Sequence, residues 1–98
     1  MNLEEKRNLL SNEFKTAVSI YEITEVRKEK VWSHKLQKVL ADYMSASTVP
    51  RMLRFLESWH IIKAQYGETE ENRPGKLFYV SNEDREAIKT LYERYWKE

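Results

Sequence analysis

The chain's 98 residues are enough for one domain with a modest core, and its composition, 41% hydrophobic and 34% charged, is ordinary for a globular protein. It contains no cysteine, which excludes a disulfide framework, thiolate chemistry and a zinc ribbon. No apolar run is long enough for a signal peptide or a membrane span. We therefore expect a cytoplasmic protein without membrane association.

Charge is distributed unevenly along the chain, although the net charge is only +1. Residues 1–26 and 64–98 each sum to −2, whereas residues 27–63 carry 8 basic and 3 acidic side chains, a balance of +5. A negatively charged partner would therefore meet the middle third of the chain. The acidic ends would keep the remaining surface away from the same partner.

The first 30 residues predict one long helix, because residues 2–28 contain neither glycine nor proline. Apolar side chains recur on one face of this helix: Leu3, Leu10, Phe14, Ala17, Val18 and Tyr21. Its first turns have little to bury. They either project toward a second subunit or form a frayed end.

Two helices are predicted in the basic middle third. Val31 and Trp32 form a short strand, and Ser33 caps the first of the two helices. Lys35 and Lys38 lie on the outer face of this helix. Its inner face is apolar and consists of Leu36, Val39, Leu40 and Tyr43. Ser47 caps the next helix, which holds Pro50 in its first turn and ends just before His60, a residue type that tolerates left-handed geometry.

Residues 47–60 have two contrasting faces at about 100° per residue. The predicted buried face consists of Val49, Met52, Leu53, Leu56 and Trp59. The opposite strip consists of Ser47, Arg51, Arg54 and Ser58, and it holds two guanidinium groups and no acid. Such a strip favours contact with phosphates, although a merely solvated face has the same composition.

A hairpin and a final helix complete the chain. Residues 61–66 and 76–80 alternate as strands around a loop that contains acidic residues beside Arg73 and Lys76. That loop either contacts a partner or is solvated and mobile.

Ser81 and Asp84 are spaced as a capping box for a helix over residues 82–98. Its apolar stripe either folds back on the first helix or pairs with a second subunit: Ile88, Leu91, Tyr92, Tyr95 and Trp96.

Residues 31–81 resemble the winged helix-turn-helix domains of small bacterial and archaeal transcription regulators, the MarR-like group among them. The resemblance is carried by residues 47–62, STVPRMLRFLESWHII. It implies a mainly helical α+β fold in a single domain, residues 1–98. The implied order is helix, short strand, helix, recognition helix, strand, wing, strand and helix, with residues 1–30 and 82–98 flanking the winged part.

The resemblance also implies a dimeric regulator that binds double-stranded DNA. The recognition helix would enter the major groove, with Arg51 and Arg54 reaching base edges. Phosphate contacts would come from the helix pair and the wing: Lys35, Lys38, Ser47, Thr48, Arg73 and Lys76. The homodimer would form through the terminal helices: Leu3, Leu10, Ile88, Leu91, Tyr92, Tyr95 and Trp96.

Other function classes have less support in the sequence. It contains no glycine-rich phosphate loop, nucleophile elbow or metal-binding helix motif, so we expect no enzyme, no cofactor and no metal site. His34 and His60 both have structural positions that explain them. The alternative function is a winged-helix protein-interaction module within a larger assembly, since a fold does not fix a function.

Overall fold

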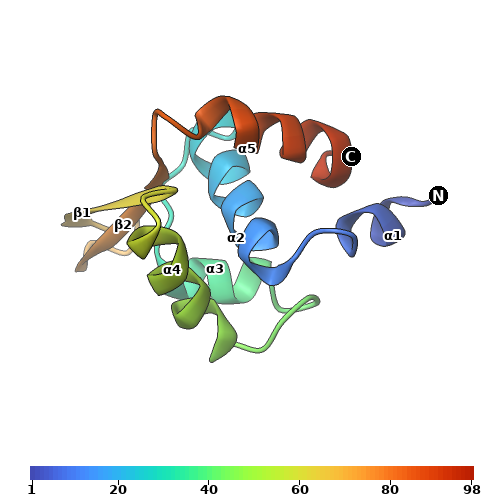
Figure 1. Ribbon diagram of the computed structural model, residues 1–98. Coiled ribbons are helices and arrows are strands. Elements are labelled where there is room, and N and C mark those ends of the chain that lie inside the picture. The colour runs from blue at the N-terminus through green and yellow to red at the C-terminus, as the bar shows by residue number, and fades with distance from the viewer.

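The computed structural model describes residues 1–98, and α2 (Asn12–Tyr21) runs through the middle of the domain (Figure 1). The other helices are α1 (Leu3–Arg7), α3 (Ser33–Val39), α4 (Thr48–Ser58) and α5 (Arg85–Leu91), with π-helical turns η1 (Glu22–Val26) and η2 (Tyr92–Trp96). Strands β1 (Ile62–Glu68) and β2 (Pro74–Val80) form an antiparallel hairpin. No helix is both long enough and apolar enough to span a bilayer.

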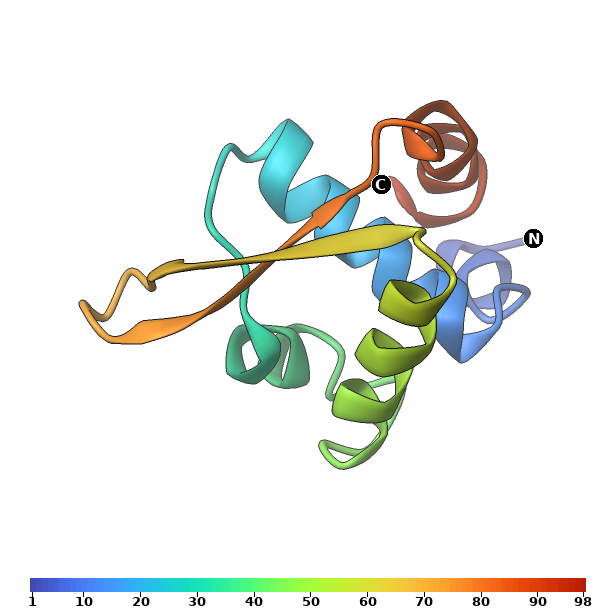
Figure 2. The ribbon, with the colours of Figure 1, turned by 60° about the vertical axis from the view of Figure 1, so that its left-hand side comes forward.

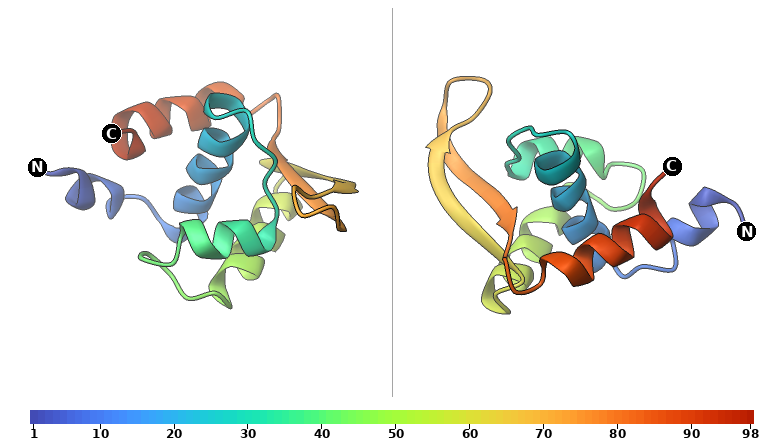
Figure 3. Two further views of the ribbon diagram at one scale, coloured as in Figure 1. Left: turned by 180° about the vertical axis from the view of Figure 1, so that it is seen from behind. Right: turned by 90° about the horizontal axis from the view of Figure 1, so that it is seen from above.

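Helix α2 is central because its sequence offers an apolar surface on several sides. Every residue from 15 to 21 is buried, and α2 packs against α3, α4, α5 and β2. Helices α3 and α4 lie on one side of α2, and α5 crosses the other (Figure 2). The hairpin and the two chain termini lie at opposite ends of the domain (Figure 3). This element order confirms the predicted α+β fold class.

The predicted long first helix is wrong, because the structure divides residues 2–26 in two. Helix α2 restarts at Ser11, whose Oγ accepts a hydrogen bond from the Phe14 amide at 3.2 Å, so the serine favours a new helix start over continuation. Helix α1 has its own cap, with Asn2 accepting from the Glu5 amide at 2.8 Å. It packs on η2, although none of its own residues is buried.

The predicted strand at residues 31–32 is reduced to one backbone contact. The Phe78 amide donates to the Val31 carbonyl at 3.0 Å, which fixes the segment before α3 against the hairpin. Ser33 is the first residue of α3 and does not cap it. The hairpin is longer than predicted, since its register runs from Ile62 opposite Val80 to Glu68 opposite Pro74.

The apolar stripe of the C-terminal segment folds back within the chain. Ile88, Tyr92 and Trp96 are buried, and the Tyr92 ring lies 5.3 Å from that of Tyr21. The Tyr92 hydroxyl donates to Glu22 at 3.0 Å. Burial, together with this carboxylate, raises the pKa of Tyr92 to about 12. Most of the residues predicted to form a dimer interface are therefore already covered in one chain.

Candidate nucleic-acid interface

Helix α4 begins and ends where the sequence predicts. Ser47 precedes it without a capping hydrogen bond, and Thr48 Oγ1 instead pairs with Ser45 Oγ at 2.8 Å. His60 follows the helix with φ 61°, the left-handed geometry predicted for it. Val49, Met52, Leu53 and Leu56 are buried as expected. Helix α4 is thus fixed by its inner face and leaves its outer face free.

The outer face of α4 presents two unpaired guanidinium groups. Arg51 and Arg54 are exposed, and neither side chain forms a hydrogen bond or an ion pair within the chain. Their three-residue spacing places them about one turn apart on the same side of the helix. Ser47 and Ser58 are also exposed at the two ends of this face, and Thr48 is partly exposed.

The structure separates the two lysines that the sequence places on the outer face of α3. Lys38 is exposed and has no ion pair. Lys35 is drawn inward, with its side chain only 15% exposed, and its ammonium pairs with Glu29 at 3.1 Å and Glu70 at 3.0 Å. Of the two, Lys38 is the one free to meet a phosphate.

The wing presents one paired and one unpaired basic side chain. Lys76 lies 3.0 Å from Glu57 of α4, and both side chains are substantially exposed. Arg73 is exposed and its guanidinium has no partner in the chain. The wing turn is organised by Thr69, whose Oγ1 accepts hydrogen bonds from the amides of Glu71 and Arg73 at 3.3 Å and 3.4 Å.

A groove of about 460 Å³ lies between α4 and the wing. Its lining includes Arg54 from α4 with Arg73 and Lys76 from the wing, so three of the predicted contact residues share one concave surface. Glu57 and Glu71 line the same groove. Arg51, Lys38, Ser47 and Thr48 lie outside it. The site is therefore a basic helix face joined by a mixed groove to the wing.

Two site features were missed by sequence reasoning. His34 and Trp32 line the groove, although neither is among the contact residues predicted from the sequence. Trp59 was predicted to be buried but is 57% exposed, and its ring lies 5.6 Å from that of the exposed Phe55. Trp59 is the C-terminal cap residue of α4 and still donates its amide to the Phe55 carbonyl at 3.1 Å. At about 100° per residue it therefore lies at the edge of the inner face rather than at its centre. Val39 is likewise exposed rather than buried.

The titratable groups form no metal centre. No three His, Asp or Glu side chains lie close enough together to hold an ion. Hydrogen bonding from Lys35, helped by Arg27, holds the pKa of Glu29 below its usual range. Burial raises the pKa of Tyr43 and lowers that of Lys15, whose ammonium donates to the Leu10 carbonyl at 2.7 Å.

No family model matches the chain, and no curated protein matches its sequence. Solved structures do share its fold. Pex, the circadian clock associated protein from Anabaena, has a TM-score of 0.64 at 19% identity, over 98% of this chain and 92% of that one. A PadR-like transcriptional regulator from Bacillus cereus has a TM-score of 0.58 at 15% identity, over 80% and 77% of the two chains.

Pex from Synechococcus sp. has a TM-score of 0.56 at 23% identity, with both chains covered at 100%. At these identities the likeness concerns the fold, which is the winged helix that the sequence resemblance implies. The three structures do not single out the MarR-like group among winged-helix proteins.

Proposed function

We propose that the protein is a regulator of transcription that binds double-stranded DNA through α4 and the wing. The observation that carries the proposal is the pair of exposed, unpaired guanidinium groups of Arg51 and Arg54 on the outer face of α4. One of the solved structures with this fold is a PadR-like transcriptional regulator. The proposal includes a cytoplasmic location and neither a cofactor nor a catalytic role. Its narrower assignment to the MarR-like group stays a prediction from residues 47–62.

In the proposed complex, the outer face of α4 lies in the major groove. Arg51 and Arg54 face base edges, where a guanidinium forms paired hydrogen bonds with guanine. Ser47 and Thr48 at the start of α4 and Lys38 on α3 contact backbone phosphates, which set position without reading sequence. The groove between α4 and the wing then receives the flanking backbone, because the unpaired Arg73 lines it from the wing side.

Titration of a random-sequence duplex by fluorescence anisotropy, at two salt concentrations, tests the proposal. Neutralising each phosphate releases counterions, so we expect the affinity to fall steeply as the salt concentration rises. A net charge of only +1 makes indiscriminate attraction weak, so such binding would reflect the local basic surface. Absence of binding at low salt, with a folded protein, would contradict the proposal.

Replacing Arg73 and Lys76 together with alanine should weaken binding to all duplexes alike, because wing contacts to phosphates carry little sequence information. Arg73 should account for most of the loss, since Lys76 is already paired with Glu57 at 3.0 Å. Anisotropy with a selected and a scrambled duplex measures both effects, and the single variants separate them. If the double variant kept the parental affinity at moderate salt, these two wing residues would contribute nothing to DNA binding.

A homodimer through the terminal helices is part of the proposal, because one short recognition helix per protomer reads only a half-site. In the single chain, Leu10, Ile88, Tyr92 and Trp96 are buried. The interface must therefore use the predicted residues that keep some exposed surface: Leu3, Leu91 and Tyr95.

Light scattering at micromolar concentration should accordingly give twice the chain mass, and Leu91→Asp should reduce it to the mass of one chain. The substitution introduces a charge that a second subunit would have to bury. A thermal melt of the variant shows whether the domain itself has unfolded. A parent protein that already has the mass of one chain would remove the dimer from the proposal.

A protein-interaction role is the second candidate function, and one observation favours it. Phe55 and Trp59 are both exposed on α4 and lie beside each other, and exposed aromatic groups are common in protein interfaces. This candidate would be preferred if duplex DNA failed to bind.

A further inference from the structure

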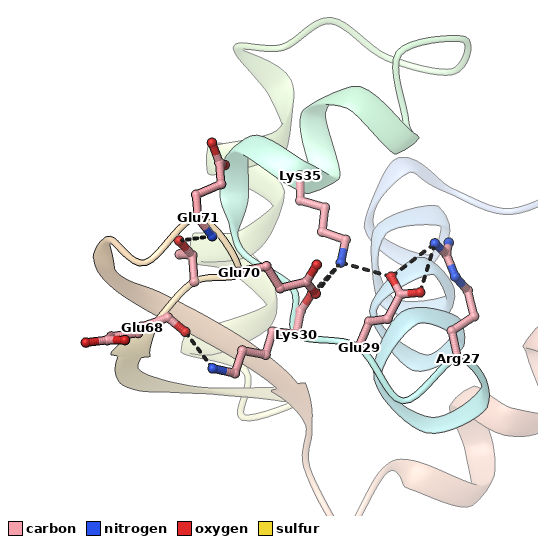
Figure 4. A network of polar contacts seen from close by, with 8 residues as sticks. Arg27, Glu29, Lys30, Lys35, Glu68, Glu70 and Glu71 are labelled. Atoms are coloured by element: carbon pink, nitrogen blue, oxygen red, sulfur yellow. Dashed lines mark hydrogen bonds and ion pairs between the residues drawn. The ribbon is translucent and has the colours of Figure 1, made fainter.

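The ammonium of Lys35 holds the wing against the body of the domain (Figure 4). It donates to Glu29 Oε1 at 3.1 Å, to the Lys30 carbonyl at 2.7 Å and to Glu70 Oε1 at 3.0 Å. A lysine ammonium has three donors and no acceptor. Its hydrogen-bonding capacity is therefore fully used inside the chain, and no donor remains for a phosphate.

The three acceptors come from two separate parts of the chain. Glu29 and Lys30 belong to the segment before α3, whereas Glu70 lies in the wing turn, 35 residues beyond Lys35. A further hydrogen bond joins the segment before α3 to the end of β1, since Lys30 Nζ donates to the Glu68 carbonyl at 2.9 Å. The wing turn is thus tied to the start of α3 by one ion pair and one hydrogen bond.

The environment of Lys35 explains why the ammonium stays turned inward. Its side chain is mostly buried, and its Nζ lies 5.1 Å from the centre of the Trp32 ring, within the range of a cation–π contact. Glu70, in contrast, is about half exposed. An exposed carboxylate contributes weakly to an ion pair, so a polyanion arriving at the wing can replace it.

We propose that Glu70 is a wing-positioning residue that withholds Lys35 from nucleic acid. Its carboxylate takes the donor that would otherwise reach a backbone phosphate, and it fixes the wing turn beside α3. DNA binding beside the wing turn is then a competition between the Glu70 carboxylate and a DNA phosphate for the Lys35 ammonium. The functional part of this inference rests on the proposed DNA binding. The Lys35–Glu70 ion pair that fixes the wing turn, which we call the latch, does not require DNA.

The chain offers a matched control in the neighbouring Glu71. Glu70→Gln and Glu71→Gln remove the same charge from the same turn, but only Glu70 pairs with Lys35. The hydrogen bond of Glu71 to Thr69 uses its backbone amide and survives the substitution. Glu71 also lines the groove, so the part of the difference between the two variants that disappears in the Lys35→Ala background reports the ion pair rather than the net charge of the wing.

The test combines each glutamine variant with Lys35→Ala and measures affinity for a mixed-sequence duplex by anisotropy across a salt series. Glu70→Gln should bind about two- to five-fold more tightly than Glu71→Gln, as expected when one weak exposed ion pair is lost. Its salt slope should be steeper by about one phosphate contact. Lys35→Ala should cost little in the parent and in Glu71→Gln, and it should abolish the gain in Glu70→Gln. An equal gain in both glutamine variants, or an equal cost of Lys35→Ala in all backgrounds, would overturn the proposal.

A second arm without DNA separates the latch from the proposed function. Backbone ¹⁵N order parameters for residues 69–73 should fall in Glu70→Gln and stay at the parental values in Glu71→Gln. Equal order parameters in the two variants overturn the latch, whatever the DNA result. If the order parameters fall as expected but the parent binds no duplex, the positioning role stands. The withholding of Lys35 from DNA then fails together with the proposed function.

Discussion

Arg51→Ala and Arg54→Ala are each expected to weaken binding to the preferred duplex by about 1–3 kcal/mol and to reduce discrimination against a scrambled duplex. Under the proposed function, both effects follow from losing a guanidinium that would pair with a base edge. Neither arginine has an ion-pair partner within the chain, so its removal does not leave a carboxylate without its partner. Thermal melting should be nearly unchanged, because both side chains are exposed. Anisotropy against the selected and scrambled duplexes measures the two effects together.

Lys38→Ala is the control for these arginines, since Lys38 is also exposed and unpaired but lies on α3. As a phosphate contact it should weaken all sequences similarly and reduce the salt slope by about one. The contrast separates base reading from charge alone. Arginine variants that melt normally and keep the parental affinity and preference would contradict the assignment of α4, and the protein-interaction role would then be preferred.

Helix α4 could be predicted from sequence because its signals are local. The apolar spacing of residues 49–56 fixes the buried face, and Pro50 near the start and His60 after the end mark the boundaries. The hairpin follows from alternation around a polar turn, though its strands run further into that turn than alternation alone indicated. These features depend on neighbours within a few residues, so one sequence is enough to find them.

Other features depend on partners far away in the chain. Lys35 was expected to face a phosphate, and nothing near it in sequence indicates that Glu70, 35 residues later, takes one of its donors. Local pattern also missed the restart of the helix at Ser11, because serine is preferred at a helix start but is also tolerated in a helix interior. Three-dimensional packing decides such cases, as it does for the C-terminal stripe.

That stripe gives the largest expected effect on stability, since Trp96→Ala should lower the free energy of unfolding by about 3–5 kcal/mol. Trp96 is 3% exposed, and its ring lies 5.1 Å from the Tyr43 ring and 4.6 Å from the Arg7 guanidinium. Arg7 also donates to the Trp96 carbonyl from Nε at 2.9 Å and from Nη2 at 2.8 Å. Removing the indole empties the junction between α1 and η2. Urea unfolding followed by circular dichroism measures the loss.

Tyr95→Ala is the matched control, because Tyr95 is adjacent but only partly buried. It should cost clearly less, and Trp96→Phe should fall between the two alanine variants because it keeps a ring in the junction. Amide exchange in α1 should accelerate in Trp96→Ala, since the packing that holds the short helix is gone. If Trp96→Ala instead kept the parental urea midpoint and only halved the mass in solution, the indole would belong to a dimer interface. The terminal helices would then be held by a second subunit rather than by their own chain.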